Sequence, residues 1–226
     1  MAEKISSAHS EKRSLPDYYS TVADDMIGFC GATARSVWVD LGSGSGGVAL
    51  ALLEKLPDSA VVLVDPDADA LGRGLHEAEE RGFHGRVVAV EGAAERIPMP
   101  DGSVDAVVSR GSFYFWKDRA RGLREVWRIL RPGGRAMIGG GLGSRYPEWA
   151  RKEFIRRKRK STEKKGAKAA AEFAEARRPE TFHRLAEEAR LPSFKVTGTG
   201  GPGADDADTG IGKWLQFEKK EDNNGQ

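Results

Sequence analysis

A glycine-rich segment that follows an acidic residue is the part of this 226-residue chain best suited to bind a ligand. Residues 37–46 read VWVDLGSGSG, so an apolar run ends at Asp40 and continues through Gly42, Gly44 and Gly46 into a helical stretch. Glycines let the backbone approach a ligand closely, and the start of the next helix offers unpaired N–H groups. The segment therefore predicts a ligand-binding loop between a strand and a helix.

Two carboxylates indicate what such a loop would hold. Asp65 ends the second apolar run, and a carboxylate about 20 residues after a glycine loop is typical of a group that accepts ribose hydroxyls. Gly42, Gly44 and Gly47 also match the pattern of dinucleotide binders, so a nicotinamide dinucleotide oxidoreductase is an alternative. Asp40 argues against it, because a carboxylate is costly beside a pyrophosphate and is stabilised beside an ammonium group.

Alternating short and long segments must position this loop. Short apolar runs rich in valine alternate with stretches of helical period, which indicates βαβ units around a parallel sheet. The predicted strands are 37–41, 60–65, 87–91, 105–109 and 136–139, and the predicted helices between them are 46–55, 67–81 and 118–130. Residues 193–199 and 213–218 predict a hairpin, because the glycine- and aspartate-rich connection cannot form a long crossover helix.

Four ordered motifs in the chain resemble those of class I S-adenosylmethionine-dependent methyltransferases of the small-molecule "type 11" group. The motifs are Asp40–Gly46, Asp65, Gly92–Asp105 and Leu130–Gly134, within a resemblance that covers about residues 18–141. It implies an α/β fold with a Rossmann-like, doubly wound, seven-stranded sheet, mostly parallel with an antiparallel C-terminal hairpin strand. It also implies S-adenosyl-L-methionine as cofactor and in-line methyl transfer to a small-molecule acceptor.

The resemblance assigns roles to residues near the loop. Asp40 would hold the cofactor's ammonium, Asp65 would accept both ribose hydroxyls, and Pro66 would lie against the adenine. The family's aspartate that contacts the adenine amino group is Ala93 here, which encourages the alternative of a non-catalytic member of the fold. The full set of expected cofactor residues is Asp40, Gly42, Ser43, Gly44, Gly46, Asp65, Pro66, Ala93, Ala94, Glu95, Ser109 and Arg110.

Candidates for the acceptor side follow the fourth predicted strand, because ligands in such sheets bind outside the carboxyl ends of strands. Arg110 would fix an acidic substrate and Tyr114 would stack on it, although residues 113–116 are as well explained as core aromatics. Tyr19 lies on an N-terminal helix that in the family folds over the cofactor. A base is optional, since positioning and desolvation can carry methyl transfer.

The charge distribution and the cysteine content bear on nucleic-acid binding, disulfides and metal sites. The net charge is +2, but residues 151–168 contain ten Lys or Arg and two Glu. A solvated helix face explains this, and the alternative is an RNA methyltransferase that uses residues 156–160 on phosphates. The single cysteine, Cys30, excludes an internal disulfide framework, and the four histidines lack ligand-like spacing, so no metal site is expected.

We expect a single methyltransferase domain over residues 17–220, flanked by flexible segments at 1–16 and 221–226. A helical, basic insertion is expected over about 145–190, where it would form a lid and substrate wall. No window approaches the roughly 18 to 20 apolar residues of a membrane span, and the N-terminus is polar, so the sequence predicts a cytoplasmic protein without a membrane partner. The methyl-accepting atom and the oligomeric state are left open.

Overall fold

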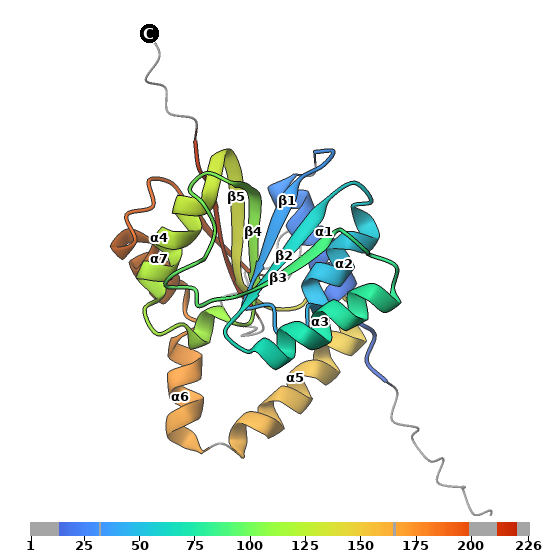
Figure 1. Cartoon of the computed structure of the whole chain (residues 1–226). Coiled ribbons are helices and arrows are strands. Elements are labelled where there is room, and N and C mark those ends of the chain that lie inside the picture. The colour runs from blue at the N-terminus through green and yellow to red at the C-terminus, as the bar shows by residue number, and fades with distance from the viewer. Residues whose placement is uncertain (1–13, 32, 165, 199–211, 221–226) are drawn as a thin grey trace, which may run out of the picture.

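A seven-stranded sheet forms the centre of the protein (Figure 1). The computed structural model describes residues 14–31, 33–164, 166–198 and 212–220. The strands are β1 (Val37–Leu41), β2 (Ala60–Asp65), β3 (Val87–Glu91), β4 (Val104–Arg110), β5 (Leu130–Gly140), β6 (Lys195–Gly198) and β7 (Lys213–Glu218). The helices are α1 (Tyr19–Cys30), α2 (Gly47–Lys55), α3 (Ala68–Glu80), a short 3-10 helix η1 (Phe113–Phe115), α4 (Arg119–Ile129), α5 (Glu148–Glu163), α6 (Ala167–Glu175) and α7 (Pro179–Glu188).

The strand order is β3-β2-β1-β4-β5-β7-β6, which confirms the predicted doubly wound sheet. The first five strands pair in parallel, and β7 pairs antiparallel with both β5 and β6. The chain moves outward from β1 to β3 and then returns to β4 on the other side of β1. The carboxyl ends of β1 and β4 are therefore the switch point at which such sheets bind ligands.

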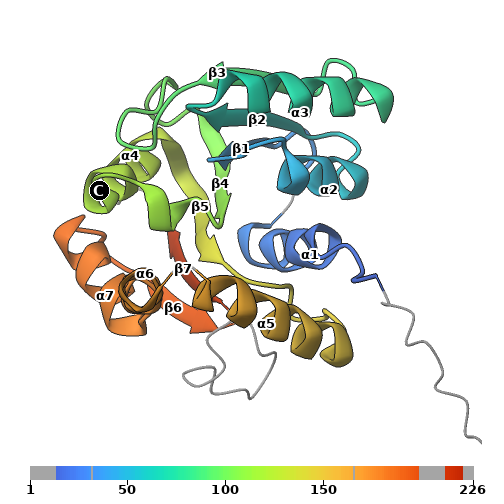
Figure 2. The same ribbon diagram turned by 90° about the horizontal axis from the view of Figure 1, so that it is seen from below.

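Helices cover both faces of the sheet, as Figure 2 shows in the view from below. Alternate residues of β1 face different layers: Trp38 packs in the cluster formed with α1 and α2, whereas Val39 and Leu41 pack in the cluster formed with α4 and α7. Burial on both faces explains why the strands read as continuous apolar runs rather than alternating ones.

The expected insertion over about 145–190 is shorter in the structure. Only α5 and α6 lie off the faces of the sheet, where they cross beneath its lower end (Figure 1). Helix α7 contacts α4, and its Phe182, Leu185 and Ala186 are buried in the main core. The apolar spacing of α7 therefore lets it pack on a face of the sheet, although its polar residues resemble those of the preceding segment.

The folded unit begins earlier in the chain than expected. Leu15 packs against a small cluster that contains Leu142 and Ala150, and the carbonyl of Pro16 accepts a hydrogen bond from the Tyr146 hydroxyl at 3.0 Å. The expected flexible segment 1–16 therefore has its last residues in the folded unit. Residues 1–13 and 221–226 lie outside the described residues. Within the described part of the chain, no helix has the length and apolar character that a bilayer span requires.

Substitution of one phenylalanine in α7 and one in α6 tests whether α7 belongs to the core and α6 does not. Phe182 is fully buried, with its ring centroid 5.1 Å from that of Phe113, whereas Phe173 of α6 is only partly buried. We expect Phe182→Ala to lower the free energy of unfolding by about 3 to 5 kcal/mol, and Phe173→Ala by less than half as much. Urea unfolding of both variants checks this. Equal losses would contradict the assignment of α7 alone to the core.

Candidate functional site

The loop after β1 adopts a conformation that requires its glycines. Gly42, Gly44 and Gly46 have positive φ angles of 68°, 53° and 78°. The N–H groups of Gly42 and Ser43 donate to the carbonyl of Val64 at 2.7 and 3.2 Å, which ties the loop to the end of β2. A Cβ on Gly42 would collide with the side chain of Ser112, whereas one on Gly44 would meet open space. Hydrogen bonds thus hold the loop against the end of β2, and the loop is open to solvent or a ligand at Gly44.

Asp65 joins this loop to the start of α3. One carboxylate oxygen accepts the Gly44 N–H at 2.8 Å, and the other accepts the Asp67 N–H at 2.9 Å. Beside it lies a cavity of about 610 Å³. Its lining includes Gly42, Asp65, Pro66, Ala93, Ala94 and Glu95. The structure therefore brings together six of the expected cofactor residues, which come from three separate strand ends.

Asp40 lies beneath the loop rather than in the cavity wall. Its side chain is almost fully buried, and its carboxylate accepts the Ala49 N–H of α2 at 3.2 Å. Burial raises the pKa of Asp40 to about 7; the Ala49 hydrogen bond lowers the pKa, nearby Asp65 raises it, and Arg110 lowers it. A cationic group next to Asp40 would favour its ionised form, so the position suits a ligand ammonium.

Ser112 connects the two strand ends at the switch point, a role that the sequence did not reveal. Its hydroxyl donates to the carbonyl of Leu41 at 2.9 Å and receives a hydrogen bond from the Trp116 indole at 3.2 Å. The hydroxyl of Ser109 lies 2.7 Å from that of Ser112. Ser109, an expected cofactor residue, is fully buried and lines neither of these cavities, and its contact with the first cavity's wall is the hydrogen bond to Ser112.

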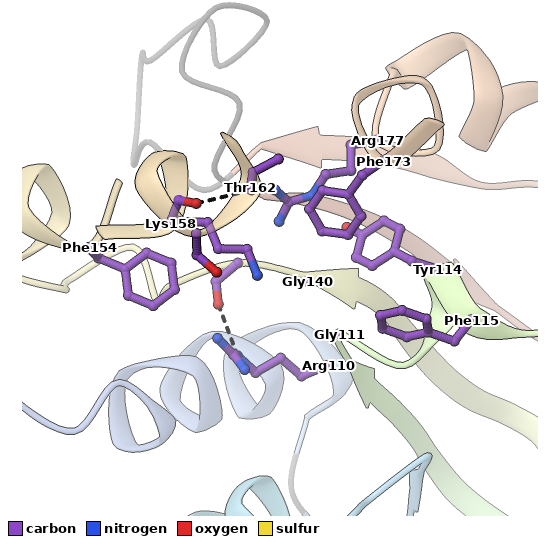
Figure 3. A pocket seen from close by; sticks show the side chains of 12 residues that line it. Arg110, Gly111, Tyr114, Phe115, Gly140, Phe154, Lys158, Thr162, Phe173 and Arg177 are labelled. Carbon is purple, nitrogen blue, oxygen red and sulfur yellow. Dashed lines mark hydrogen bonds between the residues drawn. The ribbon is translucent and has the colours of Figure 1, made fainter. Parts of the chain in front are cut away.

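A second cavity of about 310 Å³ adjoins the first at Phe115, which lines both (Figure 3). It lies at the carboxyl ends of β4 and β5, where Gly111 and Gly140 form part of its wall. The remaining lining residues are Arg110, Tyr114, Gly141, Phe154, Lys158, Ser161, Thr162, Phe173 and Arg177. Helices α5 and α6 thus supply one wall of this cavity. The sequence gave no signal for Phe154 or Phe173, because they lie in long helices without a motif.

Arg110 lines the second cavity and not the first, and its expected contact with the cofactor stays a prediction. Its Nε donates to the carbonyl of Gly141 at 3.0 Å, and its Cζ lies 4.0 Å from the ring centroid of Tyr18. Backbone and aromatic contacts therefore hold the guanidinium near the strand ends.

Tyr19 lies against the start of α2, since a Cβ on Gly47 would come within 2.5 Å of its ring. Burial, followed by the neighbouring Tyr18, raises the pKa of Tyr19 to about 12, so its hydroxyl keeps its proton at neutral pH. Helix α1 packs along α2 and β5, and the two tyrosines at its start lie near Arg110, which lines the second cavity. A role of this helix as a cap over the cofactor stays a prediction.

Several cations of the basic segment have partners in the fold. Glu153 forms ion pairs with Arg156 at 2.6 Å and with Arg157 at 2.7 Å, and Lys158 turns into the second cavity. These contacts account for three of the five residues that were expected to bind phosphates in an RNA enzyme. Across the described residues, no group of three or more histidine, cysteine, aspartate or glutamate side chains is placed to hold a metal ion.

Comparisons with known proteins agree with this arrangement. A family model described as a methyltransferase domain matches residues 39–138, from within β1 to within β5. The 2-methyl-6-phytyl-1,4-hydroquinone methyltransferase 2 of Oryza sativa subsp. japonica is 36% identical over 102 residues, which are 45% of this chain and 28% of that protein. The demethylmenaquinone methyltransferase of Thermus thermophilus is 36% identical over 100 residues, which are 44% of each chain.

The alignments thus span less than half of both curated relatives. Similarity over a longer range comes from a crystal structure of a Methanococcus maripaludis protein proposed to be an S-adenosyl-L-methionine-dependent methyltransferase. It is 27% identical, with a TM-score of 0.71 over 90% of this chain and 86% of that one. Residues 39–138 therefore match the methyltransferase-domain family, and the fold of the chain is similar to that of a protein proposed to be an S-adenosyl-L-methionine-dependent methyltransferase.

Proposed function

We propose that this protein transfers a methyl group from S-adenosylmethionine to a small-molecule acceptor bound in the second cavity. The observation that carries the proposal is that Phe115 lines both cavities, of which one includes Gly42 of the glycine loop and the other includes residues of α5 and α6. The curated relatives support a small-molecule acceptor, since their names specify a hydroquinone and demethylmenaquinone.

The first cavity has the chemistry that the cofactor needs. Asp65 would accept the ribose hydroxyls, and Pro66 and Ala94 would contact the adenine. Asp40 would face the ammonium group, which compensates its burial. Ala93 brings no carboxylate to the adenine side, but the acidic residues Glu95 and Asp118 line the same cavity.

The chain would contribute mainly by positioning and by excluding water. S-adenosylmethionine supplies an electrophilic methyl group on a sulfonium when it is bound. Among the described residues that line the second cavity there is no carboxylate and no histidine. Tyr114 keeps its proton at neutral pH, because burial raises its pKa. These residues therefore hold the acceptor rather than remove a proton from it, which agrees with orientation as the main source of rate.

A prediction on ligand affinity tests the role of Asp65 in cofactor binding. We expect S-adenosylhomocysteine to bind with micromolar affinity, and Asp65→Ala to weaken binding at least tenfold, or about 1.4 kcal/mol, because ribose contacts and the Gly44 hydrogen bond are lost. Calorimetric titration measures both values. Asp67→Ala is the matched control: it removes the N-cap of α3, costs about 1 kcal/mol of stability and leaves affinity unchanged. Full affinity in Asp65→Ala would contradict the proposal.

Asp40 should also make the stability of the folded protein depend on pH. Its pKa is about 7 in the folded protein against an ordinary value of 3.8, so the folded state keeps a proton that the unfolded state has released. Stability should therefore fall as pH rises from about 4 to 7. Relative to Asp40→Asn, we expect the cofactor-free protein to lose about 2 kcal/mol of unfolding free energy between pH 5 and 8. Urea unfolding across this range checks it, and parallel curves for the two proteins would refute it.

Ionisation of Asp40 should lower stability as the pH rises but increase the affinity for the ligand. An ammonium group pairs with ionised Asp40, so the affinity of the unsubstituted protein for S-adenosylhomocysteine should rise between pH 5.5 and 7.5. Asp40→Asn should bind at least tenfold more weakly at pH 7.5 and lose most of this rise. Calorimetric titrations at matched ionic strength compare the two proteins. An unchanged pH profile in the variant would show that Asp40 does not face the ammonium.

A further inference from the structure

The second cavity combines cationic side chains with aromatic rings. Arg110, Lys158 and Arg177 line it from three different segments, and no acidic side chain is present among its described lining residues. Figure 3 shows Arg110 and Lys158 on one side of the cavity and Arg177 beside Phe173 and Tyr114 on the other. These three cationic side chains face a partly enclosed space, where water screens charges less than at an open surface.

Two of these cations share one aromatic ring. The Nζ of Lys158 lies 5.3 Å from the ring centroid of Phe173, and the Cζ of Arg177 lies 4.6 Å from it. Arg177 is also 5.3 Å from the centroid of Tyr114. An anion bound between these two side chains would be attracted by both, and Phe173 would offer its ring beside the anion.

The Tyr114 hydroxyl adds a hydrogen-bond donor to the same place. Its oxygen is buried and has no hydrogen-bond partner of normal geometry within the described part of the chain. Burial raises its pKa, and the charges of Arg177, Arg110 and Arg119 act against that rise. A buried donor without an acceptor is costly, and a bound anion would supply the acceptor.

The shape and lining of the cavity restrict the rest of the ligand. Phe115, Phe154 and Phe173 provide apolar surface within a volume of about 310 Å³, and Phe115 adjoins the nucleoside cavity. We propose that the methyl acceptor is a compact aromatic compound with an anionic oxygen group, a carboxylate or a phosphate, which binds between Tyr114, Lys158 and Arg177. A neutral hydroquinone of the kind named for a curated relative offers no group to these cations. The inference rests on the proposed methyl transfer.

A series of simple compounds tests the charge and the ring separately. The full-length protein, saturated with S-adenosylhomocysteine, is titrated with benzoate, phenyl phosphate, benzamide and cyclohexanecarboxylate, and binding is followed by NMR. We expect at least one aromatic anion to bind tenfold or more tightly than neutral benzamide, and benzoate to bind more tightly than cyclohexanecarboxylate. The better of the two aromatic anions identifies the anionic group. Equal binding of benzamide and both anions would overturn the proposal.

Substitutions with matched neighbours locate the anion. Arg177→Gln and Lys158→Gln should each weaken binding of the preferred anion about tenfold and leave benzamide unaffected. Arg178→Gln and Lys160→Gln, which remove neighbouring charges outside this lining, should change neither. Circular dichroism and thermal unfolding establish that each variant is folded. A loss of anion binding equal in the controls and the cavity variants would show that only general charge matters, and the proposal would fail.

Tyr114→Phe separates a ligand contact from a structural one. Because the hydroxyl is buried without a partner, its removal should leave the Tm unchanged or raise it slightly. Binding of the preferred anion should nevertheless weaken about fivefold, while affinity for S-adenosylhomocysteine stays the same. A marked drop in Tm, or unaltered anion binding, would contradict the role given to this hydroxyl.

The order of measurements keeps the two proposals apart. Binding of S-adenosylhomocysteine is measured first on the same preparation, and its absence would contradict the proposed methyl transfer itself. If the nucleoside binds but the compounds show no preference for anions, the proposed function stands and the anionic acceptor is rejected.

Discussion

The position of both cavities depends on the reversal of strand order at β1 and β4. The chain runs outward from β1 through β2 to β3 before it returns to β4, so the carboxyl ends of β1 and β4 lead their following segments to opposite sides. The Gly42 and Ser43 amides bind the glycine loop to Val64 on one side, and the Ser112 hydroxyl binds Leu41 from the other. These backbone ties fix the crevice between them, and the site residues inherit their geometry from it.

The two cavities differ in charge because different parts of the fold build them. Strand ends and short turns form the first, with acidic Asp65, Glu95 and Asp118 in its wall. The second lies between strand ends and the α5–α6 wall, which contributes Lys158 and two phenylalanines. A nucleoside with hydroxyl and amino groups suits the first environment, whereas the proposed aromatic anion suits the second. Under this proposal the strand ends would bind the cofactor and the α5–α6 wall would select the acceptor.

Burial gives the charged residues of the site their distinctive properties. Asp40 is costly to ionise because it lies beneath the loop, and a ligand cation would offset that cost. Tyr114 is buried as well, and the charges of Arg177, Arg110 and Arg119 act on its hydroxyl. The ammonium proposed to lie near Asp40 and the anion proposed to lie near Tyr114 would each offset part of the cost of burial.

The sequence by itself determined the local features of this protein. The Val-rich runs marked the strands, the motif from Asp40 to Gly46 marked the loop, and Asp65 marked the end of β2, because each depends on residue types at close spacing. The tertiary structure alone decided contacts between distant segments. It placed Ser112 against Leu41 and assigned α7 to the core. It also separated Lys158, which enters a cavity, from neighbouring cations that pair with Glu153. Basic residues of one helix look alike in a sequence, and only the packing of that helix decides which of them meet a ligand.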